Sequence, residues 1–263
     1  MEIIIQRDTE EAALLVSRLI AHEIHAKPDL VLGLATGRTM EAVYARLVLM
    51  HQHDGLSFAK CRTFNLDEYI GIPPTHPSSY RYYMNTHLFN KVDINPANTH
   101  LPDGTAVNLS AECERYERII REQGGIDLQL LGIGHDGHIG FNEPLSALRS
   151  RTRDKTLTSS TRNANSSMFG GDPDNVPRRA ITMGVGTILE SRRCVMLATG
   201  ASKAGILAKA TEGPITSMIT GSALQLHPRC TVVLDEAAAT QLQGIDYYRW
   251  IFQNEPEWEY LQT

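Results

Sequence analysis

The chain has 263 residues, enough to bury a hydrophobic core as one large α/β domain or as two small ones. With 42% hydrophobic and 21% charged residues and a formal net charge of -5, its composition is that of an ordinary globular protein. It has no long basic tract to neutralise a nucleic-acid backbone, and no segment near the roughly 20 apolar residues that span a bilayer. Nucleic acid and membrane partners are therefore not expected.

The first seven residues form a short apolar run that carries an acid, Glu2, near its start. A signal peptide needs a longer apolar core with basic residues before it. None of the cysteines shows the C-x-x-C spacing that is typical of metal sites, and the four are Cys61, Cys113, Cys194 and Cys230. We therefore expect a cytoplasmic protein with reduced thiols.

Short apolar runs alternate with helical patterns along the chain. The expected strands are at 30–35, 61–66, 126–133, 180–183, 194–199 and 230–234, and the expected helices begin near Thr39 and Ser202 and cover 111–123. This alternation is typical of βαβ units, and continuous apolar runs are typical of strands that are buried on both faces. The sequence predicts one α/β domain over residues 1–263, with a mostly parallel, doubly wound (Rossmann-like) sheet.

The segment 145–179 interrupts this alternation, since it is rich in Ser, Thr, Arg and Asn and contains Gly170-Gly171-Asp172-Pro173. Long irregular segments in compact domains are often lids or binding loops, although a plain surface excursion has the same composition. We expect a lid within 145–179. Near the C-terminus, Trp250, Trp258 and Tyr260 could pack on the body of the protein or on another subunit.

Ligands of open α/β sheets bind beyond the carboxyl ends of the strands, so the polar residues after each apolar run are candidates for a site. Thr36-Gly37-Arg38-Thr39 lies between a strand and a helix, where exposed N–H groups and the positive helix end suit a phosphate. An N-cap at Thr39 would explain the same turn without a ligand. Lys203, at the start of another helix, either binds an anion or is an exposed, solvated side chain.

The sequence GIGHDGHIGFNEP, residues 132–144, contains the pattern G-x-G-x-x-G directly after a strand. That pattern favours a dinucleotide-binding fold only when a helix follows it. Gly140 and Pro144 would interrupt such a helix, and no strand ending in an acid follows about 20 residues later. We therefore reject the dinucleotide interpretation.

The same segment holds Asp136, His138 and Glu143 within eight residues. An imidazole flanked by two carboxylates can be oriented by them and can move protons to and from sugar oxygens. A metal site that also uses His135 is one alternative, and a structural turn is another. Asp67 follows the strand at 61–66 and is expected on the same rim, where a partly desolvated carboxylate can take a proton from carbon beside a carbonyl. A surface Asp that opens a turn is the alternative there.

Several blocks, in this order, resemble the glucosamine-6-phosphate deaminase family over residues 30–236. They are LGLATG, TFNLDEY followed by HPSSY, GIGHDGHIGFNEP, SRTR, VPRRAITMGVGTIL and LQLHPR. The resemblance implies an aldose–ketose isomerase and deaminase that converts glucosamine 6-phosphate and water to fructose 6-phosphate and ammonia. It implies that no cofactor and no metal take part.

The resemblance also implies residue roles. Asp67 corresponds to the base that moves the C2 proton to C1, and His138, with Asp136 and Glu143, to the group that opens the sugar ring. The implied phosphate-binding residues are Thr36, Gly37, Arg38, Thr39 and Lys203. Many family members carry a small residue at the position of Arg38 and a lid arginine at that of Ser167, so one hypothesis is that the guanidinium has moved from the lid to the turn.

Some members of the family are hexamers that N-acetylglucosamine 6-phosphate activates. Ser146, Arg153 and Lys155 match the positions that hold this effector, which predicts an allosteric site and a homo-oligomer, a hexamer if the enzyme is allosteric. A plain basic pair on the surface is the alternative, since Ala147 replaces a residue that is often Ser and the tail after Gln243 matches poorly.

Two other functions remain open. One is a related sugar-phosphate enzyme, either a 6-phosphogluconolactonase or a deaminase for another amino-sugar phosphate. The other is a sensor that binds a sugar phosphate without turnover. The presence of Asp67, Asp136, His138 and Glu143 together argues against a sensor, because binding alone does not need a set of proton-transfer groups.

Overall fold

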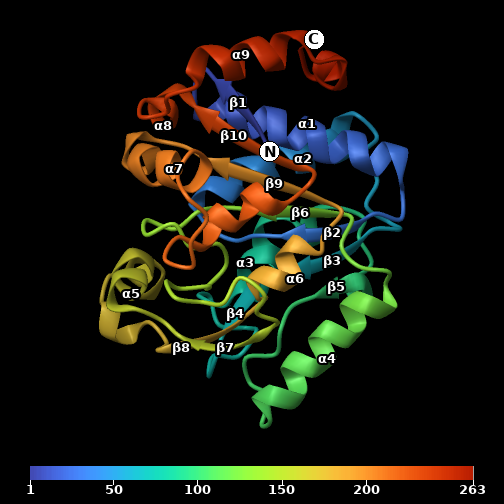
Figure 1. The fold of residues 1–263 in the computed structure, drawn as a ribbon. Helices are drawn as coiled ribbons and strands as arrows, with labels where there is room; N and C mark the ends of the chain where they lie inside the picture. Colours follow the sequence, from blue (N-terminus) through green and yellow to red (C-terminus); the bar gives the residue numbers. More distant parts are fainter. Residues whose placement is uncertain (263) are drawn as a thin grey trace.

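The computed structural model describes residues 1–262, so the last residue of the expected domain 1–263 lies outside it. Seven strands of the described chain form a parallel main sheet in the order β1-β10-β9-β6-β2-β3-β5 (Figure 1). In that order they are Glu2–Gln6, Cys230–Asp235, Arg193–Ala198, Leu128–Leu131, Val31–Leu34, Arg62–Asn65 and Thr99–His100. The expected α/β class with a mostly parallel sheet is confirmed.

A second, antiparallel sheet lies beside the first, with the order β4-β8-β7. Its strands are Asp67–Tyr69, Arg179–Thr182 and Arg153–Thr156. The strand expected at 180–183 is therefore present as β8, but it does not continue the parallel sheet. The reason is the backbone N–H of Met183, which bonds the carbonyl of Leu66 at 2.7 Å and places β8 against the residues that follow β3.

Helices lie on both sides of the main sheet (Figure 1). They are α1 (Thr9–Ala26), α2 (Arg38–His53), α3 (Tyr80–His87), α4 (Leu109–Glu122), α5 (Ser159–Asn165), α6 (Val185–Leu189), α7 (Ala204–Thr211), α8 (Glu236–Ala239), α9 (Ile245–Asn254) and α10 (Glu259–Gln262). α1 illustrates how they form: Asp8 caps its first turn, and its buried side chains recur every three or four residues. Among the described helices, none is both long and apolar enough to cross a membrane.

The core follows from the continuous apolar runs of the sequence. Every residue of β9 and β10 is buried, as the interior strands of a parallel sheet require. All four cysteines are free and buried. Part of the segment expected to be irregular, 145–179, is ordered instead, since it contains β7 and α5.

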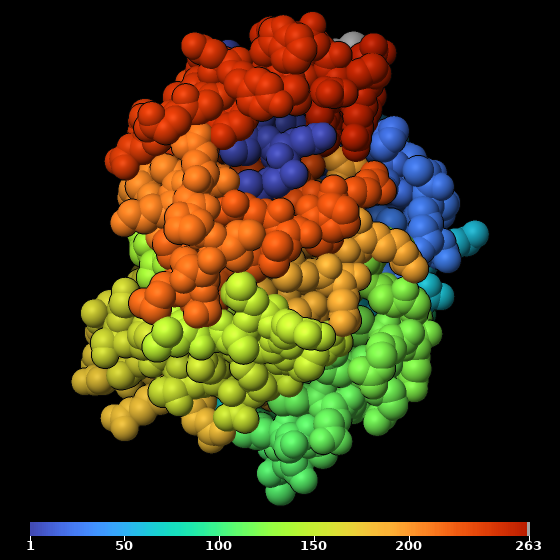
Figure 2. Space-filling view, in the orientation of Figure 1, coloured from blue at the N-terminus to red at the C-terminus, as the bar shows by residue number. Residues whose placement is uncertain are grey.

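The C-terminal helices, red in Figure 2, lie over the end of the molecule where β1, blue, is seen. Trp258 is fully buried, whereas Trp250 is 59% exposed. Arg193 on β9 places its guanidinium 5.4 Å from the centroid of the Trp258 ring and 2.8 Å from Oε1 of Glu23 on α1. Within this chain, Trp258 therefore packs on the body of the protein.

Replacing Arg193 by Ala is expected to lower the free energy of unfolding by about 2–4 kcal/mol, because it removes a charge-assisted hydrogen bond and a cation–π contact. Urea denaturation measures the change. Arg229→Ala is the matched control, since that side chain is exposed and reaches Glu257 only at 3.9 Å. Equal effects of the two substitutions would contradict an anchoring role for Arg193.

Candidate active site

A cavity of about 570 Å³ opens at the carboxyl ends of β2, β6 and β9. Residues 160–168 of the lid segment form part of its wall. It brings together most of the residues singled out from the sequence: Thr36, Gly37, Arg38, Thr39, Asp67, His135, Asp136, His138 and Lys203. Glu143, Ser146, Arg153 and Lys155 do not line it.

The turn after β2 is built around Gly37, which is the N-cap residue of α2 and has φ 119°, a conformation that favours glycine. Thr39 is therefore not the N-cap, and helix capping by its side chain does not explain the turn. No side chain of the described residues caps α2. The start of α2, where backbone N–H groups have no partner within the helix, lines the cavity, an arrangement that suits an anion.

Two cations lie on the cavity wall beside this turn. Lys203 is partly buried, its ammonium group donates a hydrogen bond to the carbonyl of Ile133 at 2.7 Å, and burial lowers its pKa. It is therefore not an exposed, solvated lysine. Arg38 donates a hydrogen bond from Nη2 to Oγ of Ser167 at 3.1 Å, so the two positions that depart from the family pattern contact each other across the cavity.

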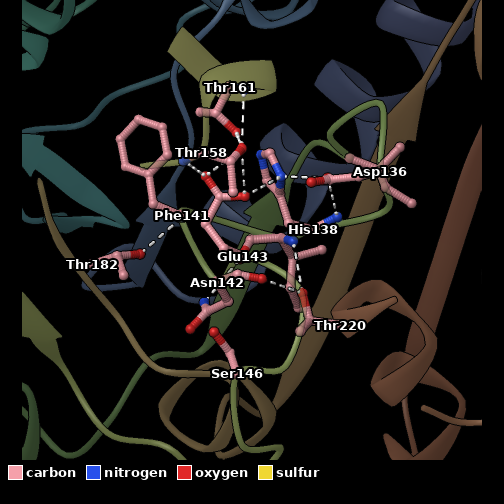
Figure 3. A network of polar contacts seen from close by, with 12 residues as sticks. Asp136, His138, Phe141, Asn142, Glu143, Ser146, Thr158, Thr161, Thr182 and Thr220 are labelled. Carbon is pink, nitrogen blue, oxygen red and sulfur yellow. Dashed lines mark hydrogen bonds and ion pairs between the residues drawn. The ribbon is translucent and has the colours of Figure 1, made fainter. Parts of the chain in front are cut away.

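The imidazole of His138 lies between two carboxylates (Figure 3). Its Nδ1 is 2.6 Å from Oδ1 of Asp136 and 3.7 Å from Oε2 of Glu143. Burial raises the pKa of Asp136, but the hydrogen bond and the charge of His138 outweigh it, so the net shift is downward. The chain can turn this tightly because of Gly134, where a Cβ would lie 2.4 Å from the His138 ring.

The donor atoms of Asp136, His138 and Glu143 lie within 4.8 Å of one another, so these three groups have the spacing for a metal ion as well as for proton transfer. His135, the fourth ligand of the metal hypothesis, is exposed and is not part of this group. Nδ1 of His138 and Oδ1 of Asp136 are 2.6 Å apart, the distance of an ion pair between a carboxylate and a protonated imidazole, so the pair is also suited to proton transfer.

Asp67 is the first residue of β4 and is 6% exposed, which excludes the alternative of a surface aspartate. Burial, and next the charge of Glu68, raise its pKa to about 8. The Glu68 carboxylate is held at the start of α3, where it accepts hydrogen bonds from the backbone N–H groups of Tyr80 and Arg81 at 3.0 and 2.9 Å. A carboxylate with this pKa is suited to act as a general base near neutral pH.

The sequence did not single out Thr158, which follows β7 and precedes α5. Its backbone N–H donates a hydrogen bond to Oε1 of Glu143 at 3.0 Å. Glu143 is 3% exposed and does not line the cavity, whereas its neighbour His138 does. A threonine three residues before Thr161 is a signal for a helix start, but nothing in the sequence links it to Glu143, 15 residues earlier.

Of the three residues expected to bind an effector, two are in contact. Nη2 of Arg153 on β7 donates a hydrogen bond to Oγ of Ser146 at 3.0 Å, and Nη1 donates one to Oδ1 of Asn142 at 2.9 Å. Lys155 lies two residues further along the same strand, on the same face of the sheet. This group is separate from the cavity.

The parallel sheet, the uncapped helix start with two cations and the buried acid–base groups define a class of protein, the α/β enzymes that act on phosphorylated sugars. A sequence model of the family described as glucosamine-6-phosphate isomerases/6-phosphogluconolactonase matches residues 6–226. Glucosamine-6-phosphate deaminase of Cellvibrio japonicus is 48% identical over 251 residues, 95% of each chain. That of Streptomyces coelicolor is 46% identical over 259 residues, 98% of this chain and 99% of its own.

Solved structures agree. A monomeric glucosamine-6-phosphate deaminase superposes with a TM-score of 0.90 at 44% identity, covering 92% of this chain and all of its own. A 6-phosphogluconolactonase from Trypanosoma cruzi shares the fold, with a TM-score of 0.73 at 20% identity, covering 92% and 97% of the two chains. The chain belongs to this family and, within it, to the glucosamine-6-phosphate deaminases.

Proposed function

We propose that the protein converts glucosamine 6-phosphate and water to fructose 6-phosphate and ammonia, in one domain of residues 1–263 with a lid within 145–179. The observation that carries this proposal is the presence of two proton-transfer groups on one cavity: buried Asp67, and His138 in contact with Asp136. A lactonase needs no base for a C–H bond, whereas an aldose–ketose isomerase does.

The substrate phosphate is held where the anion-binding groups meet. The turn of residues 36–39, at the start of α2, and Lys203 all line the cavity, so backbone N–H groups and two cationic side chains are available to a phosphate there. An anchor at this end of the substrate leaves the sugar ring within the same cavity, which Asp67 and His138 also line. Binding energy from the phosphate thereby orients the reacting carbon atoms.

Ring opening uses His138. Its imidazole takes the proton of the anomeric hydroxyl and returns a proton to the ring oxygen, so that the C1–O5 bond breaks and a free aldehyde forms. Asp136, 2.6 Å from Nδ1, orients the ring and stabilises the imidazolium that forms briefly. Glu143 is the second carboxylate near the same nitrogen, with Oε2 at 3.7 Å from Nδ1.

Isomerisation uses Asp67. Its carboxylate removes the C2 proton, the C1 carbonyl oxygen gains a proton, and an enolamine, the amino counterpart of an enediol, results. Asp67 then returns its proton to C1, which leaves a protonated imine at C2. The extra proton is the one that the C1 oxygen took from solvent, and it returns to solvent when ammonia leaves. Water adds to that carbon and the C2–N bond breaks, which releases ammonia and fructose 6-phosphate. Only protons and water are exchanged, so the reaction needs no cofactor.

The test is ammonia release from purified protein given glucosamine 6-phosphate, beside an Asp67→Asn control. Turnover by the parent that the control lacks supports the proposal. Absence of ammonia from the parent would contradict it, and a panel with 6-phosphogluconolactone and other amino-sugar phosphates would then identify the related enzyme. Saturable binding of all of them without turnover would indicate a sensor.

Replacing Arg38 by Ser is expected to raise the KM for glucosamine 6-phosphate about tenfold or more, with a small change in kcat, because a charge-assisted contact to the phosphate is lost. Steady-state kinetics measure both constants. Ser167→Ala is the control, since it removes only the hydroxyl that Arg38 contacts across the cavity. An unchanged KM in Arg38→Ser would exclude Arg38 from phosphate binding.

For regulation, we propose that N-acetylglucosamine 6-phosphate binds at Ser146, Arg153 and Lys155, and that the protein forms a homo-oligomer, a hexamer if it is allosteric. Two cations on one strand face support this proposal. The solved relative that is described as monomeric offers the contrasting assembly. The ammonia assay with and without the effector shows whether the enzyme is regulated, and sedimentation of the protein shows whether it is an oligomer or a monomer. We also propose a cytoplasmic location.

A further inference from the structure

The lid helix α5 begins at a residue that also contacts the acid–base centre. Oγ1 of Thr158 accepts a hydrogen bond from the backbone N–H of Thr161 at 3.2 Å, which caps the helix. The backbone N–H of Thr158 donates to Oε1 of Glu143 at 3.0 Å, and its hydroxyl lies 3.4 and 3.3 Å from the two carboxylate oxygens. The first turn of the lid helix and the Glu143 carboxylate are thus joined (Figure 3).

The two oxygens of Glu143 have different neighbours. Oε1 accepts the hydrogen bond from Thr158, whereas Oε2 lies 3.7 Å from Nδ1 of His138. Glu143 therefore bridges the lid and the imidazole. Because the Glu143 carboxylate is buried, a change in its hydrogen bonding strongly changes its electrostatic interaction with the imidazole of His138.

The other end of the lid contacts the strand that carries Asp67. Phe169 packs edge-on against Tyr69 of β4, with ring centroids 5.2 Å apart, and Nδ2 of Asn165 donates to the Tyr69 hydroxyl at 2.9 Å. Both ends of α5 are therefore tied to structures that hold proton-transfer groups.

We propose, on the basis of the function given above, that Thr158 is a positioning residue that couples the lid to the acid–base centre. With α5 over the cavity, Thr158 holds the Glu143 carboxylate beside His138, so the imidazole is fully supported only when the substrate is covered. Departure of α5 releases Glu143 and withdraws that support. Proton transfer is thereby restricted to the closed cavity.

The backbone at Glu143 is fixed independently of the lid. The neighbouring Asn142 is fully buried, and its Nδ2 donates hydrogen bonds to the carbonyls of Ile139 and Met183, both at 2.8 Å. A substitution that removes the Thr158 hydroxyl therefore takes away its 3.4 and 3.3 Å contacts with the Glu143 carboxylate, while the backbone N–H of residue 158 and the loop that carries Glu143 stay in place. The effect of the Thr158 side chain can therefore be measured with single substitutions at that residue.

Three variants of Thr158 separate positioning from helix capping. Val removes the hydroxyl contacts but keeps the backbone N–H that donates to Glu143, so it is expected to lower kcat about threefold, with KM within about twofold. Ser retains the hydroxyl and is expected to restore the parent kcat. Asp retains a helix cap but places a second carboxylate beside Glu143, so we expect a larger loss than with Val. Thr156→Val, at an exposed position two residues earlier, is the matched control.

Parent kcat in the Asp variant would overturn the coupling, because a residue that acts only as a helix cap is replaced by Asp without loss. A loss of kcat in the Ser variant equal to that in the Val variant would also overturn it. Ammonia release by the parent in the same assay keeps these outcomes distinct from failure of the deaminase function.

A second measurement does not depend on turnover. Coupling between two groups is reciprocal, so Glu143→Gln is expected to speed amide hydrogen exchange in residues 159–169 several-fold. Hydrogen-exchange mass spectrometry of the free protein measures this change, with Thr156→Val as the control. An exchange rate in the lid equal to that of the parent would show that the lid and Glu143 are independent.

Discussion

Replacing Asp67 by Asn is expected to lower kcat/KM for ammonia release by about 10³-fold or more, because an amide cannot accept the C2 proton. The side chain keeps its size, so the cavity keeps its shape and fructose 6-phosphate still binds. Steady-state assays of ammonia and calorimetric titration of fructose 6-phosphate measure the two effects. A variant that retains a tenth of the parent activity would exclude Asp67 as the base.

The same variant is expected to be more stable than the parent. Asp67 has a pKa of about 8 in the folded protein against 3.8 in the unfolded chain, so the folded state binds the proton more tightly. The stability that this proton contributes is present below pH 3.8 and is lost as the pH rises to about 8. At pH 8 to 9 we therefore expect Asp67→Asn to unfold several degrees above the parent in thermal denaturation. A lower melting temperature would show that burial does not penalise the charge.

The second large effect is a dependence of the reaction on pH. A base must be deprotonated to act, so kcat/KM should rise about tenfold per pH unit below about 8 and level off above it. Between pH 6 and pH 8 the change is about 50-fold, because half of the base is already deprotonated at pH 8. Initial rates at low substrate concentration in a constant-ionic-strength buffer measure this profile.

Glu68→Gln provides the control for that profile. The charge of Glu68 is the second cause, after burial, of the raised pKa of Asp67. Removing it is expected to move the rising limb of the profile to lower pH, while the shape of the limb stays the same. A profile that is flat from pH 6 to pH 9 in the parent would contradict the assignment of Asp67 as the base in the rate-determining step.

The main sheet could be predicted from the sequence because its strands are continuous apolar runs. The expected strands at 30–35 and 126–133 are β2 and β6, which are shorter by two and by four residues, and the expected strand at 194–199 is β9, which has the expected length but begins one residue earlier. The rule that ligands bind beyond the carboxyl ends of parallel strands then placed Lys203 and His138 on one rim, and both line the cavity.

The second sheet could not be predicted in the same way. β7 has the sequence RDKT, without apolar residues to reveal a strand, and the partner of β8 depends on a backbone contact between Met183 and Leu66, far apart in the chain. The link between Thr158 and Glu143 is hidden for the same reason, because a backbone N–H donor leaves no trace in residue type.

In the small sheet, Asp67 of β4 and Arg153 of β7 both lie opposite Thr182 of β8. The groups proposed for the phosphate come from a different place, the ends of β2 and β9 in the main sheet. One cavity is therefore lined by two sets of residues from different parts of the fold. One set is proposed to bind the phosphate of the substrate, and the other is proposed to transfer protons at its carbon atoms. Mutations can change the proton-transfer residues while the phosphate-binding residues stay the same. One scaffold can in this way acquire new reactions on the same kind of phosphorylated sugar.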